Sequence, residues 1–334
     1  MKKNKKEIVK RQAKAREKAR KKRQVRLVMP PPRIIERPPI SQMEAPKGFI
    51  TVSSSQALME YAKPLMETNA ENLDELNRRM ELASSLWNLA VSRQKDEQQE
   101  YSRWMERVKA GAKKVLNLDG AERERYIAEM IERQVHLFPE EAQPAPPSMF
   151  MHMRKDVSYL IPPFDAGRIR FRVDDVIPPD EEDLRLLGKI EALDDHVRRG
   201  SDYDAYEKLA ISVEDESKTV FRKWLIAKGF EDDPEQYVHC PEIYLTFLYR
   251  YVHDDPVLLK SVPNEYLIEF FEDFLLRKMI CEPVEYLYWP PSLKLFYRFL
   301  NEKGYLSANE TAHFLGRLDA MEKHFLEILQ NRYH

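Results

Sequence analysis

Residues 266–275 read YLIEFFEDFL, and apolar side chains recur in adjacent pairs along this run. The pairs are Tyr266-Leu267, Phe270-Phe271 and Phe274-Leu275. A four-residue recurrence is typical of an α-helix rather than a strand. Paired positions also make the apolar stripe wide, so this helix is expected to be buried on more than one side. Residues 243–251 (IYLTFLYRY) show a similar pairing and predict a second helix of the same kind.

Helix signals extend outward from these two runs. Asn72 with Glu75, and Ser307 with Glu310, have the spacing of a helix-starting capping box, and Gly200 stands where a glycine ends a helix. Apolar spacing predicts helical structure at 53–118, 121–137, 181–199, 204–230, 292–304 and from 308 onward. The stripe expected to face the first core comprises Leu73, Leu76, Met80, Ala83, Leu86, Trp87 and Ala90.

Proline-rich stretches divide these helices. We expect Trp289-Pro290-Pro291 to interrupt the chain, with Ser292 capping the helix that follows. The predicted organisation is a basic tail (1–28), a Pro-rich linker (29–52), an N-terminal helical segment (53–138), a second Pro-rich linker with a possible hairpin (139–179) and a C-terminal helical bundle (180–334). The predicted fold class is all-α, mainly a helical bundle, with a disordered or conditionally helical basic tail.

A short β-hairpin-like insert is expected near 157–174. There, Ile169, Phe171 and Val173 alternate with three arginines, the two-residue period of a strand. The arginine face, Arg168, Arg170 and Arg172, is expected to lie against the acidic cluster at 174–182, with an external anion as the alternative.

Charge is distributed unevenly. The formal net charge is −2, but residues 2–26 contain fourteen Lys or Arg and two Glu, a net of +12, which leaves −14 for the rest. The candidate polyanion-binding residues are Lys2, Lys3, Lys5, Lys6, Lys10, Arg11, Lys14, Arg16, Lys18, Arg20, Lys21, Lys22, Arg23 and Arg26. Such an arm releases counterions from phosphates and binds without reading sequence. RNA or the ribosome is one expected partner. The alternatives are a solubilising tail, an arm that docks on the acidic body, and contact with anionic lipid.

No motif points to catalysis, a cofactor or a metal. The chain has nine glycines, and it contains neither a Gly-rich phosphate loop nor a GxSxG or HExxH motif. Cys240 and Cys281 are too few for a disulfide framework and are expected to be unreactive thiols of a reducing compartment. No apolar run approaches the roughly 18 residues that a membrane span needs, and no apolar segment follows the basic N-terminus as in a secretory signal. A cytoplasmic location is therefore expected.

Two segments resemble a known group of proteins. They are LDELNRRMELASSLWNLAVS (73–92) and VPNEYLIEFFEDFLLRKMICEPVEYLYWPPSLKLFYRFLNEKGYL (262–306). Together with the basic tail they resemble poorly characterised bacterial helical proteins associated with the SEC-C motif. This chain lacks the CxC…C[CH] cluster of that zinc knuckle, so zinc binding is not implied.

Three functions follow as hypotheses. The favoured one is a non-enzymatic adaptor whose tail binds RNA, the ribosome or another polyanion and whose acidic helical body binds protein. The first alternative is a structural or self-associating helical protein with a merely solubilising tail. The second is an enzyme with an unrecognised site in the C-terminal bundle, for which the candidate residues are Glu272, Asp273, Arg277 and Lys278 near Tyr286 and Tyr288.

Overall fold

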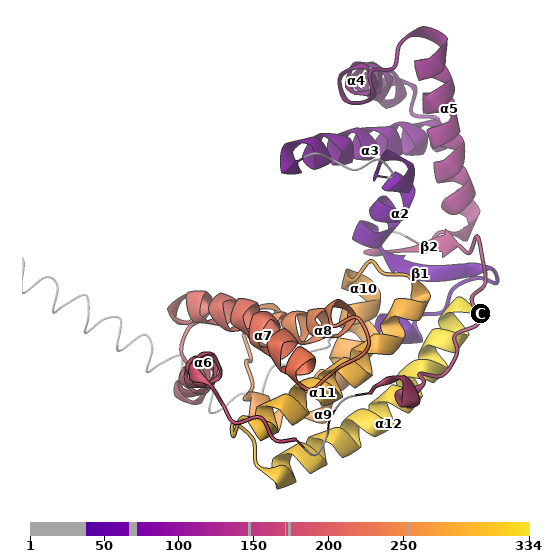
Figure 1. The fold of residues 1–334 in the computed structure, drawn as a ribbon. Coiled ribbons are helices and arrows are strands. Elements are labelled where there is room, and N and C mark those ends of the chain that lie inside the picture. Colours follow the sequence, from indigo (N-terminus) through magenta and orange to yellow (C-terminus); the bar gives the residue numbers. More distant parts are fainter. Residues whose placement is uncertain (1–37, 67–71, 146–147, 171, 173–174, 253) are drawn as a thin grey trace, which may run out of the picture. The chain divides into compact units, whose positions relative to one another are not determined.

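The computed structural model describes residues 38–66, 72–145, 148–170, 172, 175–252 and 254–334 (Figure 1). Helices dominate these residues, and their one sheet has two strands, which confirms the all-α class. The basic tail lies outside the described residues. The chain divides into two compact units. We call Phe164–Phe270 with Leu287–Lys323 the helical unit, and Pro38–Pro163 with Phe271–Tyr286 and His324–His334 the sheet unit.

The sheet unit is named for its antiparallel strand pair, β1 and β2, which pair with Thr51 opposite His152. Its elements are η1 (Ile40–Gln42), β1 (Phe49–Ser53), α2 (Ser54–Met66), α3 (Leu73–Gln94), α4 (Gln98–Leu116), α5 (Gly120–Leu137), η2 (Glu140–Ala142), β2 (Phe150–Arg154) and α10 (Leu276–Lys278). Because β2 pairs with β1, the strands fall in one unit. The unit boundary therefore lies between Pro163 and Phe164, beyond the Pro-rich run at 139–147.

The hairpin expected near 157–174 is wrong for the described residues of that range. They contain the short 3-10 helix η3 (Ala166–Arg168) and no strand, while residues 171, 173 and 174 lie outside the description. A strand needs a neighbouring backbone for its N–H and C=O groups. Here the N–H of Tyr159 donates to the carbonyl of Tyr333, and that of Ile161 donates to the side chain of Gln330. The segment is thus bonded to a helix rather than to a partner strand.

The core of the sheet unit lies among α2, α3 and α5. Trp87 is partly buried against it, with its ring 5.2 Å from that of Tyr61 and 4.8 Å from that of Phe138. Asn72 caps α3 as predicted, accepting from the N–H of Glu75 at 3.0 Å. The expected burial of Leu73 and Leu76 is wrong, since the two residues are 70% and 38% exposed. They lie near the start of α3, before the part from Leu82 onward that enters the core.

The helical unit contains the two aromatic runs. Its elements are α6 (Glu181–Arg199), η4 (Tyr203–Ala205), α7 (Glu207–Ala227), α8 (Glu235–Thr246), η5 (Phe247–Tyr251), η6 (Leu259–Ser261), α9 (Asn264–Ile268) and α11 (Trp289–Glu302). Three further helices contribute residues to both units: η7 (Glu269–Leu275), η8 (Pro283–Tyr288) and α12 (Ala308–Tyr333). Both aromatic runs are helical as predicted, but η5 and η7 are π-helices. The wider turn is a local feature that apolar spacing does not reveal.

The start predicted for the helix after Pro290-Pro291 is also wrong. Helix α11 begins at Trp289, so both prolines lie in its first turn. A proline is tolerated there because the first N–H groups of a helix have no intrahelical acceptor. Ser292 is consequently inside the helix, and its hydroxyl donates to the carbonyl of Tyr288 instead of capping.

Aromatic rings fill the core of the helical unit. Phe221 of α7 is fully buried, and its ring lies 5.4 Å from that of Phe296 and 5.7 Å from that of Phe299. Phe314 of α12 stacks on Tyr297 at 3.6 Å. Ser307 and Glu310 form the predicted reciprocal cap at the start of α12, with backbone-to-side-chain distances of 2.8 and 3.2 Å.

Gly188 inside α6 and Gly200 directly after it give opposite predictions for the same substitution. Gly200 ends the helix at φ +61°, where an added Cβ is strained, so Gly200→Ala is expected to lower the free energy of unfolding by about 1–2 kcal/mol. Gly188 lies inside the helix, and a Cβ there meets nothing within 4 Å. Gly188→Ala is therefore expected to raise the same quantity by about 0.5–1 kcal/mol. Urea unfolding followed by circular dichroism measures both, and equal effects of the two changes would contradict the assignment.

Candidate functional site

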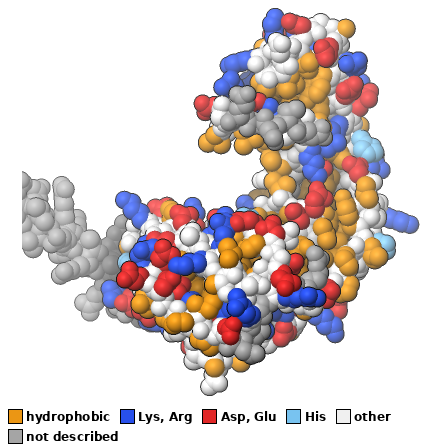
Figure 2. Space-filling model, in the orientation of Figure 1, with side chains coloured by type: hydrophobic (Ala, Val, Ile, Leu, Met, Phe, Trp, Pro, Cys, Tyr) orange, Lys and Arg blue, Asp and Glu red, His pale blue; other side chains and the backbone are white. Residues whose placement is uncertain are grey.

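The acidic charge that balances the tail is concentrated in the helical unit. Phe164–Phe270 contains 25 Asp or Glu and 14 Lys or Arg, a net of −11. Acidic side chains are visible over α6 and α7 in the space-filling view (Figure 2). The fourteen candidate residues of the tail lie outside the described residues. The structure therefore shows where the acidic residues lie, while the polyanion-binding role of the basic tail stays a prediction.

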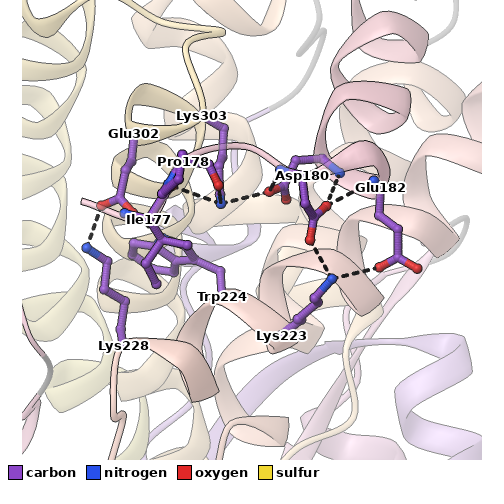
Figure 3. Close-up of polar contacts among 10 residues, drawn as sticks. Ile177, Pro178, Asp180, Glu182, Lys223, Trp224, Lys228, Glu302 and Lys303 are labelled. Atoms are coloured by element: carbon purple, nitrogen blue, oxygen red, sulfur yellow. Dashed lines mark hydrogen bonds and ion pairs between the residues drawn. The ribbon is translucent and has the colours of Figure 1, made fainter. Parts of the chain in front are cut away.

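A buried lysine fastens the segment before α6 to this unit (Figure 3). The side chain of Lys228 is 1% exposed, and its Nζ lies 2.6 Å from a carboxylate oxygen of Glu302. Lys228 also donates to the carbonyl of Asp175. Glu302 in turn accepts from the indole N–H of Trp224 and the backbone N–H of Ile177, each at 2.9 Å. These bonds lower the pKa of Glu302 against the opposing effect of its burial.

A second buried lysine, directly after α11, holds the same segment. Lys303 lies 2.7 Å from the carboxylate of Asp183, and both side chains are at most 5% exposed. Its Nζ also donates to the carbonyls of Ile177 and Pro178, at 3.1 and 3.3 Å. Every charge in this network meets an opposite charge or a backbone dipole, as burial of ions requires. We assign Lys228 and Lys303 to holding the fold rather than to chemistry.

The network continues at the surface. Lys223 bonds to Asp180 at 2.5 Å and to Glu182 at 3.2 Å (Figure 3). Asp180 is the N-cap of α6, and the bond from Lys223 together with those from the backbone lowers its pKa to about 2. The acidic cluster at 174–182 was expected to face Arg168, Arg170 and Arg172. Only part of that prediction is confirmed, because Arg172 lies 3.7 Å from Asp175, while Arg170 lies 3.9 Å from Glu231.

Two of the residues suggested for an unrecognised enzyme site bind the short helix η1 instead. Asp273 accepts two bonds from the guanidinium of Arg277, at 2.9 and 3.0 Å, and one from the backbone N–H of Ile40. Glu272 accepts from the hydroxyl of Ser41 at 3.2 Å and pairs with His324 at 3.3 Å. The two carboxylates thus anchor η1, and Lys278 is exposed. This arrangement gives no support to a catalytic role for the group.

A buried carboxylate that sequence reasoning missed lies in α6. Asp194 is fully buried and accepts from the hydroxyl of Tyr305 at 2.9 Å, with Arg198 at 3.6 Å. Burial raises the pKa of its carboxyl, and burial also raises the pKa of the Tyr305 hydroxyl. The signal was present, since Asp194 follows the buried Leu186 and Ile190 at four-residue spacing. Its pairing with Asp195 made it resemble an exposed acidic turn.

Neither cysteine is activated. Cys240 is buried and its thiol donates to the carbonyl of Trp289 at 3.3 Å, and burial raises its pKa well above the usual value. Burial likewise raises the pKa of Cys281 to about 12. A nucleophilic cysteine needs a lowered pKa, so both are thiols at neutral pH. Among the described residues no group of three or more His, Cys, Asp or Glu side chains is placed to hold a metal ion, and no helix is long and apolar enough to cross a membrane.

The sheet unit contains a cavity of about 300 Å³. Its lining comes from β1, α2, the chain around β2, residues 279–286 and the end of α12. Val52, Leu137 and Pro283 form its buried apolar part. The ring of Tyr286 stacks on that of Tyr333, with centroids 6.3 Å apart and planes at 20°. Cys281 also lines it, but as an un-ionised thiol it adds only a weakly polar surface.

Comparison of the chain with protein-family models, curated proteins and solved structures gives no match. The resemblance to SEC-C-associated proteins stays a prediction. The function must therefore be argued from charge and geometry.

Proposed function

We propose that this protein is a non-enzymatic adaptor that acts in the cytoplasm. Its tail binds the phosphate backbone of RNA, most directly that of the ribosome, and its acidic helical unit binds a basic protein. The observation that carries the proposal is the opposition of +12 in residues 2–26 to −11 in Phe164–Phe270. An arm that binds phosphates needs only a high density of positive charge. An acidic surface attracts basic partners as they approach and complements their charge in the complex.

Two features of the helical unit support the protein-binding half. Several of its carboxylates are exposed in local ion pairs, as between Arg222 and Glu235, and exposed pairs contribute little to stability. Exposed apolar side chains are also present on α6 and α7. Leu184 of α6 is 57% exposed and Ile226 of α7 is 60% exposed. A protein interface typically has an apolar core and a polar, solvent-accessible rim.

The decisive test is co-sedimentation with ribosomes and with total RNA across a salt series. The intact protein is compared with a form lacking residues 1–29 and with a full-length variant whose fourteen tail Lys and Arg are replaced by Ser. The intact protein is expected to bind and both variants to lose binding. If all fourteen cations contact single-stranded RNA, a plot of the logarithm of the binding constant against the logarithm of the salt concentration is expected to have a slope of about −10.

A tail with the same composition in scrambled order serves as the matched control. It is expected to bind as the intact protein does, because backbone contact does not read the order of residues. Equal binding by the intact and Ser-substituted proteins would refute the RNA half of the proposal. An intact protein that instead forms salt-sensitive oligomers without binding RNA would favour the self-associating alternative, in which the tail meets the acidic unit.

A further inference from the structure

The cavity of the sheet unit has the dimensions of a small-ligand site. Its volume of about 300 Å³ lies at the lower end of the range for pockets that bind small molecules. Apolar side chains make up much of the wall, and they are Ile50, Val52, Leu137, Met153, Val157, Met279 and Ile280. Such sites typically combine apolar walls with a few polar groups that fix the orientation of the ligand.

Four cations line this cavity, and two of them, Lys155 and Arg332, repel each other. Lys155 follows directly after β2, and Arg332 lies in the last turn of α12. Burial and the positive charge of Arg332 lower the pKa of Lys155. Among the described residues neither cation pairs with an Asp or Glu side chain. Lys155 reaches a main-chain oxygen of His334 at 3.4 Å and Arg332 donates to the carbonyl of Thr51, while the buried Nε of Arg332 has no hydrogen-bond acceptor within the described chain.

The carboxylates of the same cavity are already engaged. Lys63 lies 2.8 Å from Glu60 and 3.9 Å from Glu282. Glu285 accepts from the backbone N–H of Glu282 at 2.6 Å. Asp156 pairs with His136 at 3.3 Å, so none of these four neutralises Lys155 or Arg332. The four cations and four carboxylates of the lining balance in number, but Lys155 and Arg332 form a local positive pair without a carboxylate partner. This pair beside an apolar wall is the complement of an amphipathic anion.

We propose that this cavity binds a small amphipathic carboxylate, a monoanion with a medium-length alkyl or aryl group. Its carboxylate accepts hydrogen bonds from Nζ of Lys155 and from the guanidinium of Arg332, and its apolar group lies along Val52, Leu137 and the Tyr286 ring. Charge-assisted bonds of this kind are stronger than neutral ones, and a guanidinium matches the planar carboxylate. Every residue of the site belongs to the sheet unit, so the inference goes beyond the adaptor function and stands apart from it.

The test uses the full chain and octanoate, with octanol as the neutral probe of equal length. Isothermal titration calorimetry below the micellar range is expected to give one octanoate per chain, bound at least roughly tenfold more tightly than octanol. Phenylacetate extends the test to an aryl carboxylate. Equal affinity for octanoate and octanol, or no saturable binding of octanoate up to millimolar concentration, would overturn the proposal.

Variants then locate the site. Lys155→Met and Arg332→Met are each expected to weaken octanoate roughly tenfold and to leave octanol unchanged. Ile280→Trp, at a position that is 55% exposed beside the cavity, is expected to obstruct it and weaken both probes. Lys114→Met, on the exposed face of α4, is the control and is expected to change neither. Circular dichroism checks that each variant is folded. Should Arg332→Met fail to fold, unchanged octanoate binding by both Lys155→Met and Ile280→Trp would still refute the site.

Discussion

Replacing Lys303 with Met is expected to lower the free energy of unfolding by about 3–5 kcal/mol. The substitution keeps the apolar stem but removes the ammonium that lies 2.7 Å from Asp183. It leaves a carboxylate that is 4% exposed without its counter-charge, and it frees the carbonyls of Ile177 and Pro178. The cost of an uncompensated buried charge dominates this effect, not the loss of the attraction alone. Urea unfolding followed by circular dichroism measures it.

A matched control lies in the same network. Lys223→Met removes an ammonium that pairs with Asp180 and Glu182 at the surface, where water screens the charges, so little change is expected. Combining Lys303→Met with Asp183→Asn removes both charges. The amide introduced by Asp183→Asn keeps an oxygen that can accept from the N–H of Asp180, so the double variant is expected to recover part of the lost stability. A Lys303→Met protein as stable as Lys223→Met would show that Lys303 is not a structural cation.

Phe221→Ala is the second large effect we expect, again a loss of about 3–5 kcal/mol. Phe221 is fully buried and its ring meets those of Trp224, Phe296 and Phe299. Truncation removes the burial of an aromatic ring and opens a cavity that rigid helices fill only partly. The Trp224 ring, 5.9 Å away, provides a fluorescence signal for the loss of packing.

The control for this substitution is Ile226→Ala, further along α7. Ile226 is 60% exposed, so its truncation is expected to change stability by less than about 0.5 kcal/mol. The two variants differ in burial while sharing one helix. Similar losses in both would mean that α7 contributes through its propensity alone and that the aromatic cluster is not the core of the helical unit.

Helices were the part of the fold that the sequence predicted well, because their signals are local. The capping pairs Asn72–Glu75 and Ser307–Glu310 and the terminating Gly200 act within a few residues of themselves. The strand pair was not local. Residues 49–53 and 150–154 are almost a hundred positions apart, and neither segment contains a sequence pattern that identifies the other as its pairing strand. The alternation at 168–173 predicted a hairpin within a single segment instead. The backbone N–H groups around it donate to α12 and to the carbonyl of Lys228 rather than to a partner strand.

The candidate functional sites also differ in whether their sequence signals are local. The tail was visible in the sequence because charge density needs no fold to be recognised. The cavity was not, since Lys155 and Arg332 belong to no motif and become neighbours only through the fold. The enzyme hypothesis was misleading for the opposite reason. Glu272, Asp273 and Arg277 are close in sequence, and their proximity is used to hold η1 and to neutralise one another.

The discontinuity of the sheet unit sets an order of events during synthesis. Pro38–Pro163 leave the ribosome first, yet the unit also requires Phe271–Tyr286 and His324–His334, which follow the helical segments. At roughly 5–20 residues per second, the first part waits on the order of 10–30 s for the last. During that interval β1 and β2 can pair, but the cavity has neither Tyr286 nor Arg332. The nascent chain therefore exposes unfinished apolar surface for seconds, a period in which chaperones compete with misassembly.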